Sequence, residues 1–224
     1  MEKQFKAVLF DLDGTLLDTL EDLAAAANRM LDTNGFPTHP IDAYRHFVGN
    51  GAAMLVHRIL PPAVRSKETE KKYLMSFLND YRQHWRSRTR PYPGIADMLD
   101  ALTDRHIRMA VLSSKPHDMT VQCVEHFFSQ WSFDSVLGQR PGVPKKPDPA
   151  GAVETVRHMD LAPAAFIYMG VTSIDMKTAR SAGMFAMGVR WGFRPAAELQ
   201  SGGAHILIDQ PLDIIAYLDG AGYL

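Results

Sequence analysis

Two carboxylates one residue apart follow an apolar run near the start of the chain. The segment is FDLDGT, residues 10–15, in which Asp11 and Asp13 precede Gly14. A turn at the end of a strand can be built from one Asp or Asn and a glycine, so folding does not require the second carboxylate. The additional carboxylate therefore indicates chemistry at this turn.

Hydroxyl groups, lysines and a third carboxylate follow the later apolar runs of the chain. The residues that follow the successive runs are Thr15 after the first, Ser113, Ser114 and Lys115 after the second, Lys145 and Lys146 after the third, and Thr172, Ser173 and Asp175 after the fourth. An open parallel sheet binds ligands beyond the carboxyl ends of its strands. Such a sheet would bring these groups together at one edge with Asp11 and Asp13.

This combination of side chains suits phosphoryl transfer. An aspartate can attack phosphorus and form an acyl phosphate, and a second carboxylate two residues along can protonate the departing oxygen and then activate water. Lysine and hydroxyl groups can neutralise the phosphoryl oxygens. Two carboxylates repel a trianionic transition state, so we expect a hard divalent cation such as Mg2+ to bridge them.

Six short apolar runs with helical segments between them predict an α/β fold in which helices cover both faces of a parallel sheet. The runs are residues 6–12, 107–113, 133–138, 165–170, 185–191 and 205–208. About ninety residues separate the first run from the second, several times the length that a βαβ crossover requires. This long connection predicts an inserted lobe.

The insertion has apolar residues at helical spacing and no convincing strand, so we predict a small all-helical domain. Thr19 and Asp22 have the spacing of a capping box at its start, and PYPG at 91–94 marks the return to the sheet. The predicted domains are therefore a core formed by residues 1–16 and 91–224 and a helical lobe formed by residues 17–90.

Composition limits the kind of partner. The chain of 224 residues has 24 basic and 25 acidic side chains, 46% hydrophobic residues and a single cysteine, Cys123. The net charge of -1 favours neither nucleic acid nor a membrane surface, and one cysteine excludes an intrachain disulfide. We expect a soluble, unprocessed cytoplasmic protein, monomeric or homodimeric, that binds a small phosphorylated metabolite locally.

The segment DLDGTLLDT resembles the first signature of the haloacid dehalogenase (HAD) superfamily of phosphohydrolases. The other three signatures follow in order, with Ser113 in VLSSKP, Lys146 in KKPDP and Asp175 in GVTSID. The resemblance covers essentially the whole chain and implies a Rossmann-like core with the helical cap of subgroup I. VGNG, SSKP, PGVPKKPDP and GVRWGFR most resemble the phosphoglycolate phosphatases, which implies 2-phosphoglycolate as substrate. A β-phosphoglucomutase-like phosphotransferase is the enzymatic alternative.

The resemblance also implies roles for individual residues. It implies Asp11 as nucleophile and metal ligand, Asp13 as general acid and base whose backbone carbonyl faces Mg2+, Ser113 as phosphoryl-binding residue, Lys146 as the partner of Asp11 and the phosphate, and Asp175 as the second carboxylate of the fourth signature and a metal ligand. The hydroxyls of Thr15 and Ser114 are further candidates for binding substrate. Gly49 and Asn50 form either a loop over the substrate or a plain interhelical turn.

The chain departs from the superfamily at Val171. The fourth signature normally reads Gly-Asp-x-x-x-Asp, and its first Asp, which binds magnesium, is replaced here by valine. Loss of a ligand from an octahedral site weakens metal binding or adds a water molecule. Three interpretations are open: Asp175 or Thr172 reaches the metal and activity persists, the protein is a binding or regulatory protein without turnover, or the valine is peculiar to this chain.

Overall fold

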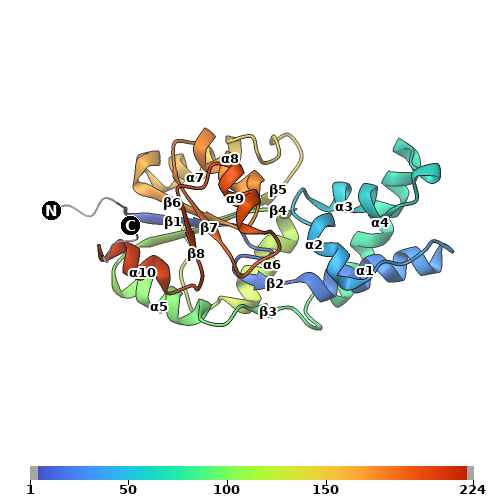
Figure 1. The fold of residues 1–224 in the computed structure, drawn as a ribbon, viewed down its shortest axis with the longest axis horizontal. Helices are drawn as coiled ribbons and strands as arrows, with labels where there is room; N and C mark the ends of the chain where they lie inside the picture. The colour runs from blue at the N-terminus through green and yellow to red at the C-terminus, as the bar shows by residue number, and fades with distance from the viewer. Residues whose placement is uncertain (1–4, 221–224) are drawn as a thin grey trace.

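The computed structural model describes residues 5–220 and consists of two lobes (Figure 1). An α/β core contains the larger sheet, and a helical cap lies at one end of the long axis of the molecule. Within residues 5–220 no helix has the length and apolar character needed to cross a membrane.

The core sheet has six parallel strands in the order β5-β4-β1-β6-β7-β8. The strands are β1 (Ala7–Phe10), β4 (Arg108–Pro116), β5 (Ser135–Gln139), β6 (Phe166–Gly170), β7 (Phe185–Val189) and β8 (Ile206–Ile208). Each predicted apolar run therefore forms a strand, and the predicted α/β class is confirmed. β4 and β5 lie on one side of β1, and β6 lies on the other, so the strand order reverses beside β1. Ligands bind at such a switch point in open α/β sheets.

Alternate residues of the strands face opposite layers of helices. Val8 and Phe10 belong to the apolar cluster beneath one layer, whereas Ala7 and Leu9 belong to the cluster beneath the other. The first layer contains α5 (Ile95–Asp104), α6 (His117–Phe127) and α10 (Asp213–Leu218), and the second contains α7 (Ala150–Met159), α8 (Ser173–Ser181) and α9 (Ala196–Ser201), with a 3-10 turn at Pro163–Ala165. Figure 1 shows the two layers on either side of the sheet.

The cap consists of helices, as predicted. Its elements are α1 (Leu20–Thr33), α2 (Tyr44–Phe47), α3 (Ala52–Ile59) and α4 (Lys67–His84), with 3-10 turns at Ile41–Ala43 and Pro62–Val64. Where the chain leaves and re-enters the core, β2 (Leu17–Asp18) pairs antiparallel with β3 (Arg90–Pro91). The sequence did not predict this pair, because two residues are too few to show a strand periodicity.

The predicted capping box at the start of the cap is wrong. Thr19 precedes α1, but its hydroxyl makes no hydrogen bond with the first turn of the helix. The Asp22 carboxylate instead accepts hydrogen bonds from the backbone N–H groups of Arg88 and Thr89, at 3.0 and 2.8 Å, and from the Thr89 hydroxyl at 2.8 Å. Asp22 therefore connects the outgoing helix to the returning chain, which only the tertiary fold brings together.

Candidate active site

The side chains of the four signatures meet at the carboxyl ends of the central strands. Asp11 directly follows β1, Ser113 lies on the neighbouring strand β4, and Asp175 lies in the first turn of α8, after β6. Lys146 reaches the same place from the loop between β5 and α7. The predicted convergence of these residues at one edge of the sheet is therefore what the fold produces.

Lys146 connects two of the carboxylates. Its ammonium group lies 2.8 Å from Asp11 Oδ1 and 2.7 Å from Asp175 Oδ1. The Leu112 carbonyl and the Tyr168 hydroxyl, each at 3.2 Å, are further acceptors. The lysine side chain is 5% exposed, and every one of these partners belongs to the core. Burial lowers the pKa of Lys146, but the two carboxylates more than offset this effect and hold the pKa well above its ordinary value.

Asp175 caps helix α8 and holds Lys146 at the same time. Its Oδ2 accepts hydrogen bonds from the backbone N–H groups of Val171 and Thr172, at 3.2 and 3.0 Å, and from the Thr172 hydroxyl at 2.8 Å. Its Oδ1 accepts from Lys146. A Cβ on Gly170 would lie 2.4 Å from the Asp175 Cβ, so glycine permits this close approach. Both carboxylate oxygens are therefore used within the protein.

Asp11 lies between opposing electrostatic influences. Burial is the largest influence on its carboxyl group, and together with the charge of Asp175 it raises the pKa of Asp11 to about 7. The ammonium group of Lys146 acts in the opposite direction. A carboxylate held among other carboxylates at the edge of a cavity is typical of a reactive group.

Asp13 is paired with a second buried lysine. Asp13 Oδ1 lies 3.0 Å from Lys115 Nζ, within ion-pair distance although not aligned as a hydrogen bond. Lys115 also donates a 2.9 Å hydrogen bond to the hydroxyl of Tyr81, on cap helix α4. Burial lowers the pKa of Lys115, but Asp13 and Tyr81 outweigh it and raise the pKa above its ordinary value. The contacts of Lys115 with Asp13 and Tyr81 thus connect the core to the cap.

A cavity of about 50 Å³ lies between the core and the cap. Asp11, Asp13, Ser113, Ser114 and Lys115 contribute to its core side, together with Pro116. The cap side is mainly apolar and consists of Leu23, Val48, Gly49, Gly51, Ala52, Leu55, Phe77, Leu78 and Tyr81. Because a single water molecule requires roughly 10–15 Å³ by the same measure, the space left in this cavity corresponds to a few waters or a small group.

The cap loop VGNG lies directly over the core. Gly49 and Gly51 line the cavity, and both have positive φ angles, of 113° and 82°. A Cβ on Gly49 would lie 3.1 Å from Thr172 Cγ2, and a Cβ on Gly51 would lie 3.3 Å from the Ser114 carbonyl oxygen. Asn50 is half-buried but does not line the cavity. Gly49 and Gly51 of this loop therefore border the cavity and lie close to the core.

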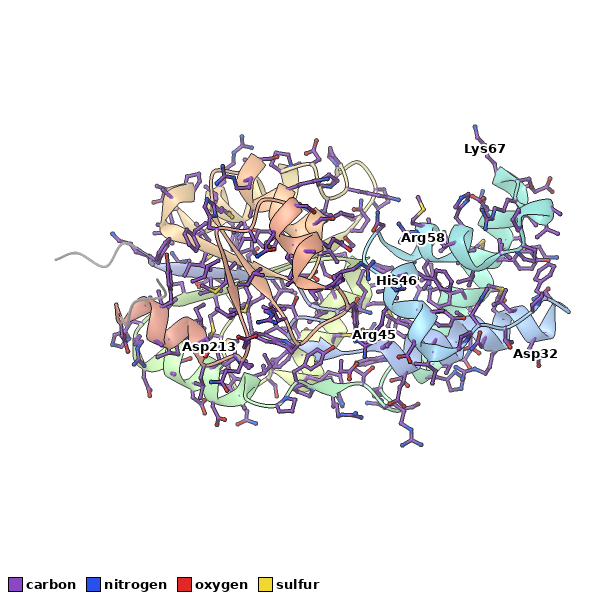
Figure 2. The ribbon with its side chains drawn as sticks, in the orientation of Figure 1. Asp32, Arg45, His46, Arg58, Lys67 and Asp213 are labelled. Atoms are coloured by element: carbon purple, nitrogen blue, oxygen red, sulfur yellow. The ribbon has the colours of Figure 1, made fainter. Side chains whose placement is uncertain are left out.

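Two arginines cross the boundary between core and cap. Arg194 of the core donates a 2.7 Å hydrogen bond to the Val48 carbonyl, and Arg45 of the cap donates a 3.3 Å bond to the Gly192 carbonyl. Figure 2 shows Arg45 and His46 where the helical cap meets the core. These reciprocal contacts hold the cap over the cavity.

The remaining residues near the site are one that was predicted to bind substrate and three that were assigned no role. Thr15 is fully buried and does not line the cavity, although its backbone carbonyl accepts a 3.0 Å hydrogen bond from Trp191. Tyr81 and Tyr168 were not among the predicted site residues, and Lys115 was expected at this edge of the sheet but was assigned no role. Lys115 follows the two serines at a strand end, which is a usable signal. The tyrosines carry none, because an aromatic residue at helix or strand spacing is usually a packing residue.

Val171 lies in the hydrophobic core. Its side chain is fully buried, and a Cβ on Gly192 would lie 2.1 Å from Val171 Cγ2. Among residues 5–220, no group of three or more His, Cys, Asp or Glu side chains is arranged to hold a metal ion. The Asp11 carboxylate lines the cavity, and the family resemblance implies the Asp13 backbone carbonyl as a second candidate ligand. Magnesium is commonly bound by one or two carboxylates, substrate phosphate and waters, so this reduced set still fits Mg2+.

Known proteins share both the sequence and the architecture of this chain. A phosphoglycolate phosphatase of Pseudomonas putida is 31% identical over 219 residues, which cover 96% of this chain and 79% of the relative. A phosphoglycolate phosphatase of Psychrobacter arcticus is 32% identical, with 89% of each chain covered. The crystal structure of a candidate phosphoglycolate phosphatase from Lactobacillus delbrueckii subsp. bulgaricus matches with a TM-score of 0.90 at 30% identity, covering 96% of this chain and 98% of that one.

The family match spans both lobes of the molecule. The model of the haloacid dehalogenase-like hydrolases matches residues 8–189, from the first strand of the sheet to the end of β7. This range contains the two aspartates after β1, the whole cap, Lys146 and α8. The chain belongs to the haloacid dehalogenase-like hydrolase family.

Proposed function

We propose that this protein is a Mg2+-dependent phosphatase that hydrolyses a small phosphomonoester, with 2-phosphoglycolate as the first substrate to test. The contact of Lys146 with Asp11, at a cavity that also contains Asp13 and Ser113, carries the proposal. The phosphoglycolate phosphatases among its relatives support the choice of substrate. The small volume of the cavity is in keeping with a short-chain ester.

In the proposed reaction Asp11 attacks phosphorus and forms an aspartyl phosphate. The bond between phosphorus and the alcohol oxygen breaks, and Asp13 gives its proton to the departing oxygen. Asp13 then accepts a proton from the water that attacks the aspartyl phosphate, which releases inorganic phosphate and restores Asp11. Ser113 and Lys146 contribute a hydroxyl and a positive charge to the phosphoryl oxygens.

The Asp11 carboxylate and the Asp13 backbone carbonyl would hold Mg2+. When bound, the ion supplies positive charge that offsets the negative charge of the phosphoryl group and the carboxylates. With Val171 in the core, we expect a water molecule in place of the missing aspartate ligand and a correspondingly weaker affinity for Mg2+. Asp175 orients Lys146 in this scheme, because both of its oxygens accept hydrogen bonds within the protein.

A second candidate function is the binding of phosphorylated ligands without turnover. Val171 favours it, because valine has no oxygen to offer a metal ion and its side chain is buried in the core. The intact set of Asp11, Asp13 and Lys146 favours catalysis. The two candidates differ in whether phosphate is released.

Release of phosphate from 2-phosphoglycolate, ethyl phosphate and β-glucose 1-phosphate, with and without Mg2+, tests the proposed function. We expect Mg2+-dependent turnover of 2-phosphoglycolate that the Asp11→Asn variant lacks. Turnover restored only in Val171→Asp would support the second candidate for the natural chain. Preferred turnover of the sugar phosphate would contradict the proposed substrate.

A further inference from the structure

The cavity has an acidic end and a largely apolar wall, with a single cation between them. Among the described residues that line it, Lys115 is the only lysine or arginine. Its side chain is 2% exposed, and its ammonium group lies between Asp13 of the core and Tyr81 of the cap. A buried cation beside the proposed general acid is not needed to bind the phosphoryl group, because Lys146 already lies beside Asp11.

Lys115 retains a hydrogen-bond donor for a ligand. An ammonium group has three N–H donors. Within residues 5–220, one donor is directed to the Tyr81 hydroxyl at 2.9 Å, and Asp13 Oδ1 lies 3.0 Å from the ammonium group without being aligned as a hydrogen bond. At least one donor is therefore left for an acceptor within the cavity that Lys115 lines.

Tyr81 offers a second donor at the same place. Its oxygen accepts the hydrogen bond from Lys115, so its own hydrogen must point to another acceptor. No described residue provides that acceptor, although the side chain is almost fully buried and lines the cavity. Leaving a buried donor without a partner costs about 1–3 kcal/mol, so this arrangement indicates a ligand acceptor.

The structure assigns Lys115 and Tyr81 as the residues that bind a carboxylate carried by the alcohol portion of the substrate. This assignment rests on the proposed phosphatase function and names its substrate class as small phosphorylated hydroxy acids. In such an ester the carboxylate lies on the carbon next to the ester oxygen, close to the group that Asp13 protonates. Lys115, 3.0 Å from Asp13, is placed to meet it. The apolar cap wall then covers the short carbon chain.

Binding of two phosphonates that cannot be hydrolysed separates this assignment from the catalytic proposal. The probes are 3-phosphonopropionate, which carries a carboxylate, and propylphosphonate, which has a methyl group in its place. Isothermal titration calorimetry in the presence of Mg2+ gives the ratio of their affinities for the wild-type protein, Lys115→Met and Tyr81→Phe. This ratio requires no turnover, so it remains informative if phosphate release fails.

We expect the wild-type protein to bind 3-phosphonopropionate about tenfold or more tightly than propylphosphonate, as for a hydrogen-bonded charge pair. The preference should fall to about twofold or less in Lys115→Met and decrease by about fivefold in Tyr81→Phe. Tyr44→Phe is the matched control, because this buried cap tyrosine donates its hydroxyl to Asn28 and does not line the cavity. Equal affinities in the wild-type protein, or a preference that survives in Tyr81→Phe and Lys115→Met, would overturn the assignment.

Discussion

The site contains two buried lysines in contrasting surroundings. Lys146 contacts Asp11 and Asp175, and every partner of its ammonium group belongs to the core. Lys115 contacts Asp13 and a tyrosine of the cap, and it lines the cavity. Both lysines have raised pKa values because the neighbouring carboxylates outweigh the effect of burial. The acceptors around Lys146 use all of its N–H donors, whereas those that the structure describes around Lys115 do not.

We propose that this difference separates a fixed catalytic framework around Lys146 from a ligand-binding region around Lys115. The ammonium group of Lys146 has more acceptors than hydrogens, so the core alone fixes its position. Lys115 depends on α4 for one partner, so opening of the cap would remove Tyr81 from it. Chemistry at Asp11 should therefore depend on the first lysine, and selection of substrate on the second.

Of the substitutions near Lys146, replacement of the proposed nucleophile Asp11 should have the largest effect on turnover. Asp11→Asn cannot form an aspartyl phosphate, so we expect kcat to fall roughly a thousandfold or more. Steady-state phosphate release measures the loss, and circular dichroism verifies that the variant is folded. Substantial residual turnover in the folded variant would place the nucleophile elsewhere and remove the distinction between the two lysines.

Removal of the core lysine should destabilise the protein strongly. Lys146→Met leaves Asp11 and Asp175 buried without their cation, and breaking a buried pair in this way costs about 3–5 kcal/mol. Urea unfolding monitored by circular dichroism measures the change in the free energy of unfolding. Lys145→Met is the matched control, because its side chain is exposed and should change stability by less than about 0.5 kcal/mol. Equal effects of the two substitutions would contradict the framework role of Lys146.

The reactivity of the Cys123 thiol tests whether the region around Lys115 stays buried in the native protein. Burial raises the pKa of Cys123 to about 11, although the nearby Lys115 acts in the opposite direction. The thiolate is the reactive form, so alkylation should accelerate about tenfold per pH unit between pH 7 and about 11. Near pH 8 we expect iodoacetamide to react with the native protein at least about a hundredfold more slowly than with the urea-unfolded chain. Comparable rates would show that α6 opens frequently and that the Lys115 region is not held shut.

Restoration of an aspartate at the fourth signature should have a smaller effect, limited to the affinity for Mg2+. Val171→Asp adds a carboxylate, so we expect Mg2+ to bind about tenfold more tightly. The Mg2+ concentration that gives half-maximal activity measures this change, and a larger rise in Tm with Mg2+ than in the wild-type protein measures it independently of turnover. Val171→Ala controls for loss of the apolar contact. An unchanged Mg2+ dependence in Val171→Asp would mean that residue 171 does not face the metal.

The sequence predicted the elements of the core well because each strand is a continuous apolar run bounded by turn residues. The run at 165–170, for example, became β6, and the segment that follows it became α8. The short pair β2 and β3 was missed because two residues carry no periodicity. Asp22 was misinterpreted for a different reason: its partners lie 66 and 67 residues away, and local sequence spacing cannot show them.

The site was predictable where its residues follow strands. Asp11 and Ser113 lie at strand ends in the sequence and also line the same cavity. The contact of Tyr81 with Lys115 was not predictable, because it depends on the docking of a cap helix rather than on any local pattern. Asp175 was predicted as a metal ligand, and the sequence did not show that its carboxylate also accepts the hydrogen bonds of a capping box and one from Lys146. The donors that surround a carboxylate are known only when the whole fold positions them.

Trapping the phosphorylated enzyme tests the central claim most directly. We would mix the protein with radiolabelled 2-phosphoglycolate and Mg2+, quench it in acid within milliseconds and locate the label by peptide mapping. The account predicts a label on the peptide that contains Asp11, removed by hydroxylamine as for an acyl phosphate, and absent from Asp11→Asn. Turnover accompanied by a label at another residue, or no turnover with Mg2+ present, would contradict the assignment of Asp11 as the nucleophile of an active phosphatase.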